Sequence, residues 1–380
     1  MAPTHAPEQL GFPHFVSAAQ MTRPLMELTI RRTNDMRRML EVVNGCTRHW
    51  PMMITGEDGV AYHCNLEGRK VVMDQGEPSS RTFGSFMFAT VSMEGVLVPY
   101  PLDNSLQKGE SKQSHYMMMA GNHPAAVVTR SSDNLDPHRA AWLFESYPGT
   151  VPDKQRYGAV ISGGDGTNEH PTQAILDMYT IWQTLGRIDN FTLLITGDLE
   201  YSRTINSLLN LICNVCQGVR IKIAMPVVED IEYGPPEEVL YRLTQAGVDH
   251  ETVPISSSHD FELLLTNHDI DIVYSTRPQL ERYKAALVPD PNQMVRDIVS
   301  CIRITPELLD KSGVRLFHPL PHTDEVDNAC DFHPQSMYFK QASNGVPVRM
   351  ALLQLILLDL ELLQSLGNPV PTFPLGWAAL

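Results

Sequence analysis

Short apolar segments alternate with helical patterns along most of this 380-residue chain, and this alternation constrains the fold more than any other feature. The strand candidates lie at residues 70–73, 96–99, 125–129, 191–195, 221–225 and 271–274. Parallel strands need crossover connections of helical length, so the alternation predicts βαβ units. The chain is long enough for two domains. We therefore predict an α/β protein with two domains, each a parallel sheet flanked by helices.

Two further helical patterns lie towards the ends of the chain, at 26–44 and at 341–366. The second is strongly apolar, and we expect it to pack back onto the first domain, because so many apolar residues need buried partners. Residues 47–67, between the first helix and the first strand candidate, carry turn signals.

The segment DGTNEHPTQAILDMYTI, at 165–181, reads as a loop that runs directly into a helix. Pro171 suits the first helical position, because its φ is already helical and its missing N–H is not needed there. His170 and Gln173 are three residues apart and can point past the helix N-terminus on one side. Helix N-termini attract anions and polarised oxygens. The segment could therefore bind a carbonyl group through His170 and Gln173. Taken alone, it is explained equally well as a structural helix with a capped N-terminus.

A cluster of hydroxyl groups and one arginine occurs in GEPSSRTFGSF, at 76–86. Ser79, Ser80, Arg81 and Thr82 offer three hydroxyls and a guanidinium at an expected helix start, and such groups bind phosphate. Taken alone, an ordinary Ser or Thr N-cap accounts for the same residues. Lys108 lies on another polar loop, DNSLQKGES, for which a solvated turn is the simpler interpretation.

Three more segments place polar residues after strand candidates or apolar runs. In TGDLEYSRTINSL, Arg203 lies close to a strand-to-helix turn. In DIVYSTRPQLER, Arg277 and Gln279 are two residues apart in extended chain, and we expect them to face the same way. In FHPLPHTDEV, prolines bracket a loop in which Pro319 and Leu320 can present backbone carbonyl groups.

Together these segments resemble the aspartate carbamoyltransferase family, whose enzymes make N-carbamoyl-L-aspartate for pyrimidine synthesis. The HPTQ, GDLxYxRT, TRxQxER and HPLP segments occur in the family's order and at similar intervals. The resemblance extends from HFVSAAQMT, at 14–22, to VPVRMALLQLIL, at 346–357. Related ornithine enzymes usually carry HCLP where this chain has HPLP, so the loop favours aspartate as the substrate.

The resemblance implies that residues 1–170, completed by 341–380, form a carbamoyl phosphate-binding domain. The residues that it assigns to the phosphate are Ser79, Ser80, Arg81 and Thr82, and those that it assigns to the carbamoyl group are Arg130, His170 and Gln173. Thr82 would also help Arg130 and His170 to polarise the carbonyl oxygen. Lys108 resembles a lysine that reaches into a neighbouring subunit's site. The family likeness therefore also implies a homotrimer with shared active sites.

The resemblance implies that residues 171–340 form an aspartate-binding domain. Arg203 and Arg277 match the arginines that hold the two aspartate carboxylates, and Gln279 matches their neighbour. Pro319 and Leu320 match the loop whose carbonyls face the carbamoyl amide and the incoming amine. No cofactor or metal is implied, because positioning and charge stabilisation suffice for attack of the amine on the carbonyl carbon. The departing phosphate can take the amine proton.

Several positions depart from the family pattern. Phe83 and Met87 replace an Arg and a Glu that the family usually has, Asn104 stands where a Ser is usual, and Glu200 stands where some members have Lys. Asp74 and Gln75 also lie near the expected phosphate loop. The changes reduce positive charge near anion sites, which leaves open a carbamoyltransferase for a different amine. A catalytically idle relative acting as an assembly or regulatory subunit is a second alternative.

The composition narrows the class of protein further. The formal net charge of −15, without a basic stripe, argues against nucleic-acid binding. No apolar run is long enough to span a bilayer, and the N-terminus has no signal-peptide pattern, so we expect a cytoplasmic enzyme. No G-x-G-x-x-G is present, which disfavours a dinucleotide-binding dehydrogenase. The sequence leaves open whether a regulatory chain docks onto this protein. An acidic protein that binds acidic substrates needs local positive charge in its binding cleft. The residues that would supply this charge are Arg81, Lys108, Arg130, Arg203 and Arg277.

Overall fold

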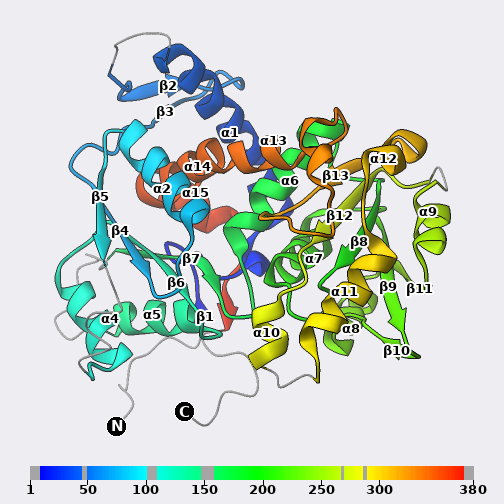
Figure 1. Ribbon diagram of the computed structural model, residues 1–380. Helices are drawn as coiled ribbons and strands as arrows, with labels where there is room; N and C mark the ends of the chain where they lie inside the picture. The colour runs from blue at the N-terminus through cyan, green and yellow to red at the C-terminus, as the bar shows by residue number, and fades with distance from the viewer. Residues whose placement is uncertain are drawn as a thin grey trace. The chain divides into compact units, whose positions relative to one another are not determined.

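The chain forms two compact α/β units in the computed structural model, which describes residues 9–44, 49–100, 109–146, 158–266, 269–285 and 289–371. Unit 1 comprises Met1–Ile175 and Gly345–Leu380, and unit 2 comprises Leu176–Asn344. Each unit contains a parallel sheet flanked by helices, which confirms the predicted fold class (Figure 1). In the described part of the chain, no helix is both long and apolar enough to cross a membrane.

Unit 1 is built around a four-stranded parallel sheet with the order β5-β4-β6-β7. The strands are β4 (Lys70–Gln75), β5 (Val96–Tyr100), β6 (Ala126–Ser131) and β7 (Ala159–Asp165). The connecting helices are α2 (Ser80–Ser92), α4 (Lys112–Gly121) and α5 (Asp136–Glu145). The chain moves from β4 outward to β5 and then returns to the other side of β4 for β6. The strand order therefore reverses between β4 and β6, and crevices at such reversals, beyond the carboxyl ends of the strands, are where open α/β sheets bind ligands.

The ends of the chain complete unit 1. Helix α1 (Arg23–Asn44) follows the short η1 (Ala18–Gln20), and β1 (Gln9–Leu10) pairs antiparallel with β14 (Val370–Pro371). An antiparallel hairpin of β2 (Met53–Thr55) and β3 (Ala61–His63) occupies the segment for which the sequence indicated only turns.

The expected C-terminal helix at 341–366 is divided into α13 (Tyr338–Ser343), α14 (Gly345–Leu358) and α15 (Leu360–Leu366). Helix α14 packs against α1 and α2, so the predicted return to the first domain is confirmed (Figure 1). Eleven residues of α14 are buried, which explains why its sequence is apolar all round rather than on one face.

Unit 2 contains a parallel sheet with the order β11-β9-β8-β12-β13, and the short β10 pairs antiparallel with β9. The strands are β8 (Thr192–Gly197), β9 (Arg220–Val228), β10 (Ile231–Glu232), β11 (Asp249–Ile255), β12 (Ile272–Thr276) and β13 (Arg315–Phe317). The helices that accompany these strands are α6 (Pro171–Leu185), α7 (Arg203–Val215), α8 (Glu237–Gln245), α9 (Ser258–Thr266), α10 (Leu280–Ala285), α11 (Pro291–Ile302) and α12 (Pro306–Ser312). The division between the two units falls inside α6. The order reverses between β8 and β12, which marks a second expected ligand position.

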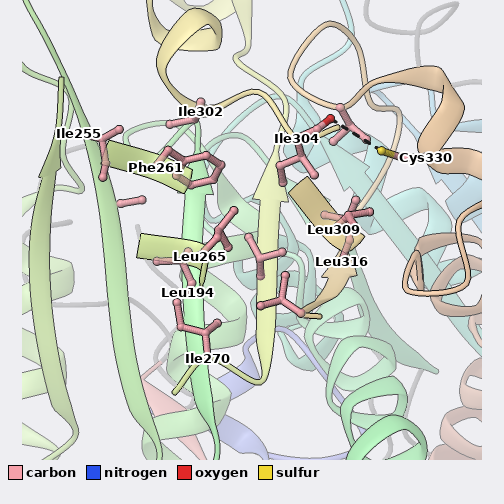
Figure 2. Close-up of a cluster of buried hydrophobic side chains, with 14 of the residues drawn as sticks. Leu194, Ile255, Phe261, Leu265, Ile270, Ile302, Ile304, Leu309, Leu316 and Cys330 are labelled. Atoms are coloured by element: carbon pink, nitrogen blue, oxygen red, sulfur yellow. Dashed lines mark hydrogen bonds between the residues drawn. The ribbon is translucent and has the colours of Figure 1, made fainter. Parts of the chain in front are cut away.

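A hydrophobic cluster between the unit 2 sheet and its helices holds these strands in place (Figure 2). Leu194 of β8 and Leu316 of β13 are fully buried in it beside Phe261 of α9, which is 1% exposed. The Cys330 thiol donates to the carbonyl oxygen of Ile304 at 3.7 Å. Burying a Leu or Phe side chain stabilises a fold by about 1.5–3 kcal/mol, so this cluster gives the carboxyl ends of β8, β12 and β13 a rigid base.

Candidate active site

The predicted phosphate-binding loop lies at the reversal point of unit 1, between the end of β4 and the start of α2. Ser79 is the N-cap of α2, and its hydroxyl accepts from the Thr82 backbone N–H at 3.3 Å. The Ser79 hydroxyl also donates to the Thr82 hydroxyl at 3.1 Å, and Gln75 Nε2 donates to the Ser79 carbonyl at 3.3 Å. Ser80 and Arg81 occupy the first turn of α2, and Arg81 is exposed. The loop thus presents hydroxyl groups and a cation at a helix N-terminus, which suits an anion.

Three of the predicted carbamoyl contacts are brought together beside this loop. Thr82 Oγ1 lies 3.4 Å from His170 Nε2, although the two residues are 88 positions apart. Gly164, near the end of β7, separates His170 from Arg130: a β-carbon there would lie 2.9 Å from Arg130 Nη1 and 3.2 Å from His170 Cδ2. The φ of Gly164 is 108°, a value that favours glycine. All three side chains are more than nine-tenths buried.

Arg130 is held by a residue that the sequence did not single out. Its Nη2 pairs with Glu77 Oε1 at 2.8 Å, its Nε donates to the Glu77 carbonyl at 3.2 Å, and its Nη1 donates to the Gly163 carbonyl at 2.9 Å. Glu77 and Arg130 are 53 residues apart, so the pairing has no local sequence signal. An anion that binds Arg130 would compete with the Glu77 carboxylate for the same guanidinium.

Two buried carboxylates, those of Asp165 and Glu169, hold the loop that carries His170 in place through hydrogen bonds. Asp165 Oδ1 accepts from the Glu169 N–H at 3.1 Å, and Oδ2 accepts from Asn168 Nδ2 at 3.0 Å and from the Leu135 N–H at 2.5 Å. Burial raises the pKa of Asp165 to about 7. Glu169 in turn accepts from the Ser17 hydroxyl at 2.7 Å and the Ala18 N–H at 2.8 Å. These bonds fix the entry to α6, and sequence reasoning did not anticipate them.

Gln173 and Asp74 are the remaining described residues near the candidate carbamoyl phosphate site. Gln173 is half-buried in the first turn of α6, where its N–H donates to the His170 carbonyl at 2.9 Å. Asp74 is fully buried, and its Oδ1 lies 3.3 Å from His115 Nε2 of α4. Burial raises the pKa of Asp74. Lys108, like Asn104, lies outside the described residues.

The reversal point of unit 2 places the ends of β8 and β12 in direct contact. A β-carbon at Gly197 would lie 1.9 Å from the Thr276 carbonyl oxygen, and the φ of Gly197 is 101°. Gln279 connects the two strand ends: its N–H donates to Asp198 Oδ2 at 3.0 Å, and its Nε2 donates to the same atom at 3.2 Å and to the Tyr201 carbonyl at 3.0 Å. Burial raises the pKa of Asp198, which sequence reasoning did not identify.

The two arginines expected on the aspartate side follow these strand ends. Arg203 is the first residue of α7 and is half-buried, after the N-cap Ser202. Arg277 follows β12, and its Nη1 and Nη2 pair with the two oxygens of Glu281 at 3.0 and 2.5 Å. These bonds raise the pKa of Arg277. The side chains of Arg277 and Gln279 bond to different partners, Glu281 and Asp198.

The loop after β13 is held in one conformation by His318. The N–H of Leu320 donates to His318 Nδ1 at 2.8 Å, so the ring proton lies on Nε2, which is 3.0 Å from Glu325 Oε1. Burial opposes ionisation of Glu325, but its bonds with His318 and Thr323 hold its pKa below the ordinary value. Leu320 has a φ of 59°, a strained value of the kind found at ligand clamps. Pro319 and Leu320 thus lie in a braced turn.

Within the described ranges, no three His, Cys, Asp or Glu side chains form a group that could hold a metal ion. The described residues offer two sets of polar groups, one within each unit. The set in unit 1 suits a phosphate and a carbonyl oxygen, and the set in unit 2 offers arginines at two strand ends.

Comparison with known proteins identifies the family of both parts of the chain. The family model described as the carbamoyl-P binding domain of aspartate/ornithine carbamoyltransferase matches residues 13–183, and the model of the Asp/Orn binding domain matches residues 189–356. The aspartate carbamoyltransferase catalytic subunit of Methanococcus maripaludis strain C6 is 34% identical over 300 residues, which cover 78% of this chain and 88% of that protein. The corresponding subunit of Korarchaeum cryptofilum is 35% identical over 292 residues, 76% of this chain and 87% of that protein.

Solved structures show the same fold. The catalytic subunit of M. jannaschii aspartate transcarbamoylase superposes with a TM-score of 0.73 at 28% identity, covering 92% of this chain and 99% of that one. Aspartate transcarbamoylase from Trypanosoma cruzi, in complex with carbamoyl aspartate and phosphate, has a TM-score of 0.73 at 24% identity, covering 94% and 100%, and shows the likeness of fold alone. The expected family is thereby confirmed: the chain belongs to the aspartate/ornithine carbamoyltransferases.

Proposed function

We propose that this protein transfers the carbamoyl group of carbamoyl phosphate to the α-amine of L-aspartate, giving N-carbamoyl-L-aspartate and phosphate. The observation that carries the proposal is the convergence of Thr82, His170 and Arg130 around Gly164, beside a hydroxyl-rich helix N-terminus. The names of the relatives at 34% and 35% identity, aspartate carbamoyltransferase catalytic subunits, support aspartate over ornithine. The pathway would be pyrimidine biosynthesis.

Unit 1 would bind carbamoyl phosphate. The hydroxyls and N–H groups of Ser79, Ser80 and Thr82, with Arg81, would hold the phosphate at the α2 N-terminus. His170, Thr82 and Arg130 would donate to the carbonyl oxygen, where negative charge develops when the amine attacks. Gln173 would contact the carbamoyl amide. The domain boundaries that we assign to this role remain 1–170 with 341–380.

The chemistry proceeds through a tetrahedral intermediate. The lone pair of the aspartate amine forms the new C–N bond, and the bond between the carbonyl carbon and the phosphate oxygen then breaks. The amine proton passes to the departing phosphate, so no side-chain base is required. Catalysis rests on positioning and on preorganised donors in a site from which water is excluded.

Unit 2 would bind aspartate, within residues 171–340. Arg203 and Arg277 would each hold one carboxylate, because a planar guanidinium fork matches a carboxylate. Gln279 would act beside them, and the carbonyls of Pro319 and Leu320 would accept from the incoming amine and the carbamoyl amide. Arg277 would exchange its pairing with Glu281 for the substrate. Ornithine would place an ammonium beside an arginine, and that repulsion disfavours it.

A second copy of the chain would complete the site as a homotrimer. Among the described strands, β5 lies at the edge of the unit 1 sheet, beside α2. Phe88 and Val91 of α2 are both 58% exposed, and Val96 of β5 is 49% exposed. Large apolar groups at a sheet edge favour a protein interface. Lys108 follows this strand in the sequence, and we assign it to a neighbouring subunit's site.

Binding of the bisubstrate analogue N-(phosphonacetyl)-L-aspartate tests the proposal. The analogue joins a phosphonate to an aspartate, so it engages both sets of groups, and we expect it to raise the melting temperature far more than phosphate or aspartate alone. Arg81→Ala and Arg277→Ala should each reduce the shift. Equal shifts for the analogue and for phosphate would argue against the aspartate half, and no shift with either would argue against both halves.

A further inference from the structure

A buried carboxylate in unit 2 is bonded to strand β12, which precedes Arg277, and to helix α13. Asp177, on α6, is fully buried, and each of its oxygens accepts a hydrogen bond from a different element. The Tyr274 hydroxyl of β12 donates to Oδ2 at 2.8 Å, and Gln341 Nε2 of α13 donates to Oδ1 at 2.6 Å. A buried carboxylate is costly unless it is hydrogen-bonded, so its bonds to these two elements are strongly favoured.

The Gln341 amide carries this connection on to the loop after β13. Its Oε1 accepts from the His318 N–H at 3.0 Å, while its Nε2 faces Asp177. The backbone N–H of His318 can only donate, so it faces Oε1 and leaves Nε2 as the donor to Asp177. Gln341 is 1% exposed. His318 itself braces the following turn through the Leu320 N–H, so Gln341 contacts the residue that holds the turn.

Tyr274 provides the other half of the connection. It lies three residues before Arg277 and is fully buried in β12. Burial and the nearby Asp177 carboxylate raise the pKa of Tyr274 well above its ordinary value, so the phenol stays protonated and remains a donor. Asp177 therefore has one bonded path to the end of β12 and another to the loop that carries Pro319 and Leu320.

We propose that Asp177 is a positioning residue for aspartate: through Tyr274 and Gln341 it sets the distance between the Arg277 strand end and the Pro319–Leu320 turn. The inference rests on the function proposed above. An apolar side chain of similar size could fill the same space, but it would not fix the two elements by directional bonds. The bonds described here join elements of unit 2, so we expect the network to affect aspartate and to leave carbamoyl phosphate unaffected.

Tyr274→Phe and Gln341→Met test the proposal, with Thr180→Val as the matched control. Thr180 lies one turn after Asp177 on α6, is fully buried, and its hydroxyl accepts from Asn344 Nδ2 at 2.9 Å. Tyr274→Phe and Thr180→Val each delete one buried hydroxyl bonded at α6, but only Tyr274 is bonded to the carboxylate that joins β12 to the loop. We expect Tyr274→Phe and Gln341→Met to raise KM for aspartate on the order of tenfold, with KM for carbamoyl phosphate unchanged. Thr180→Val should leave both constants unchanged while lowering the melting temperature.

Two further measurements separate positioning from general destabilisation. The double variant Tyr274→Phe/Gln341→Met should raise KM by less than the product of the single effects, because both act through one carboxylate. In the ligand-free protein, Tyr274→Phe should speed amide hydrogen exchange at His318 and Leu320 by about tenfold, because Asp177 would hold Gln341 and the loop less firmly. Thr180→Val should not change these exchange rates.

The outcomes distinguish this inference from the function on which it rests. If Tyr274→Phe and Gln341→Met shift KM no more than Thr180→Val, the network supports only the core and the inference is wrong. If the unmodified protein shows no aspartate-dependent phosphate release, the proposed function fails, and the exchange rates of His318 and Leu320 alone decide whether Asp177 couples the two elements.

Discussion

Gly164→Ala should damage the reaction without unfolding the protein. The added β-carbon would lie 2.9 Å from Arg130 Nη1 and 3.2 Å from His170 Cδ2. Ordinary van der Waals contact begins near 3.5 Å, so the guanidinium has to retreat by about 0.6 Å and the imidazole by about 0.3 Å. The φ of 108° adds strain of about 1–3 kcal/mol for a residue with a side chain.

These displacements move two of the three groups that we assign to the carbonyl oxygen. A misplacement of about 1 Å can cost on the order of 10²-fold in rate, so we expect kcat to fall between about 10-fold and 10²-fold. Gly186→Ala is the matched control, because Gly186 also has a positive φ, of 71°, but a β-carbon there meets nothing within 4 Å.

The assay is the initial rate of phosphate release at saturating carbamoyl phosphate and aspartate, with the melting temperature measured in parallel. Both variants should lose stability through backbone strain, and only Gly164→Ala should lose activity beyond what its unfolded fraction explains. If the two variants turned over equally fast, the close packing of Arg130 and His170 against Gly164 would be irrelevant to catalysis, and the reasoning would be refuted.

Four other predictions follow from the same account. His170→Ala should lower kcat on the order of 10²–10³-fold, the usual effect of losing one donor to a developing oxyanion, with phosphate binding measured by calorimetry nearly unchanged; a normal kcat would exclude the role. Arg277→Lys should raise KM for aspartate sharply in steady-state assays, because lysine lacks the bidentate fork, and an unchanged KM would contradict that contact. Mixing Lys108→Ala with His170→Ala subunits should restore part of the activity, and no recovery after proven subunit exchange would exclude shared sites. Burial lowers the pKa of His138 to about 4, so as the pH drops from about 6.5 to about 4 the unfolded chain takes up a proton that the folded protein does not, and the free energy of unfolding should fall. His138→Leu should remove up to about 3 kcal/mol of this pH dependence, measured by urea titrations at a series of pH values.

The strands that the sequence predicted correctly share one property. Segments such as KVVMDQ and TLLITG are short, rich in β-branched or apolar residues, and followed by helical patterns, so local preference and tertiary packing agree. Strand β7 was missed, because Gly163 and Gly164 interrupt its apolar pattern. Gly164 occupies that position because Arg130 and His170 pack against it. The local rule therefore fails where the candidate site requires space.

The polar contacts within the site were the least predictable part. Glu77 lies two residues before Ser79, in a segment already marked as a phosphate loop, but nothing local connects it with Arg130. Asp198 lies in the GDLEYSRT segment, and its bonds to Gln279 reach across 81 residues. Such pairings depend on which strand ends the sheet order brings together, and local sequence patterns do not reveal that order.

The C-terminal helix was predicted as one element because its apolar residues continue from 341 to 366. It is divided at Asn344, whose side chain donates to Thr180 Oγ1 at 2.9 Å and to Gln183 Oε1 at 2.8 Å on α6. It is divided again at Asp359, which accepts from Arg32 Nη2 at 3.3 Å. Both breaks are set by tertiary contacts, which override the helical pattern.

The direct test of the proposed function is the reaction itself. Purified protein is incubated with carbamoyl phosphate and either L-aspartate or L-ornithine, and phosphate and carbamoylated product are quantified together. Our account predicts equal amounts of phosphate and N-carbamoyl-L-aspartate with aspartate, and no product with ornithine. Faster product formation with ornithine or a neutral amine than with aspartate would contradict the assignment of Arg203 and Arg277 to two carboxylates.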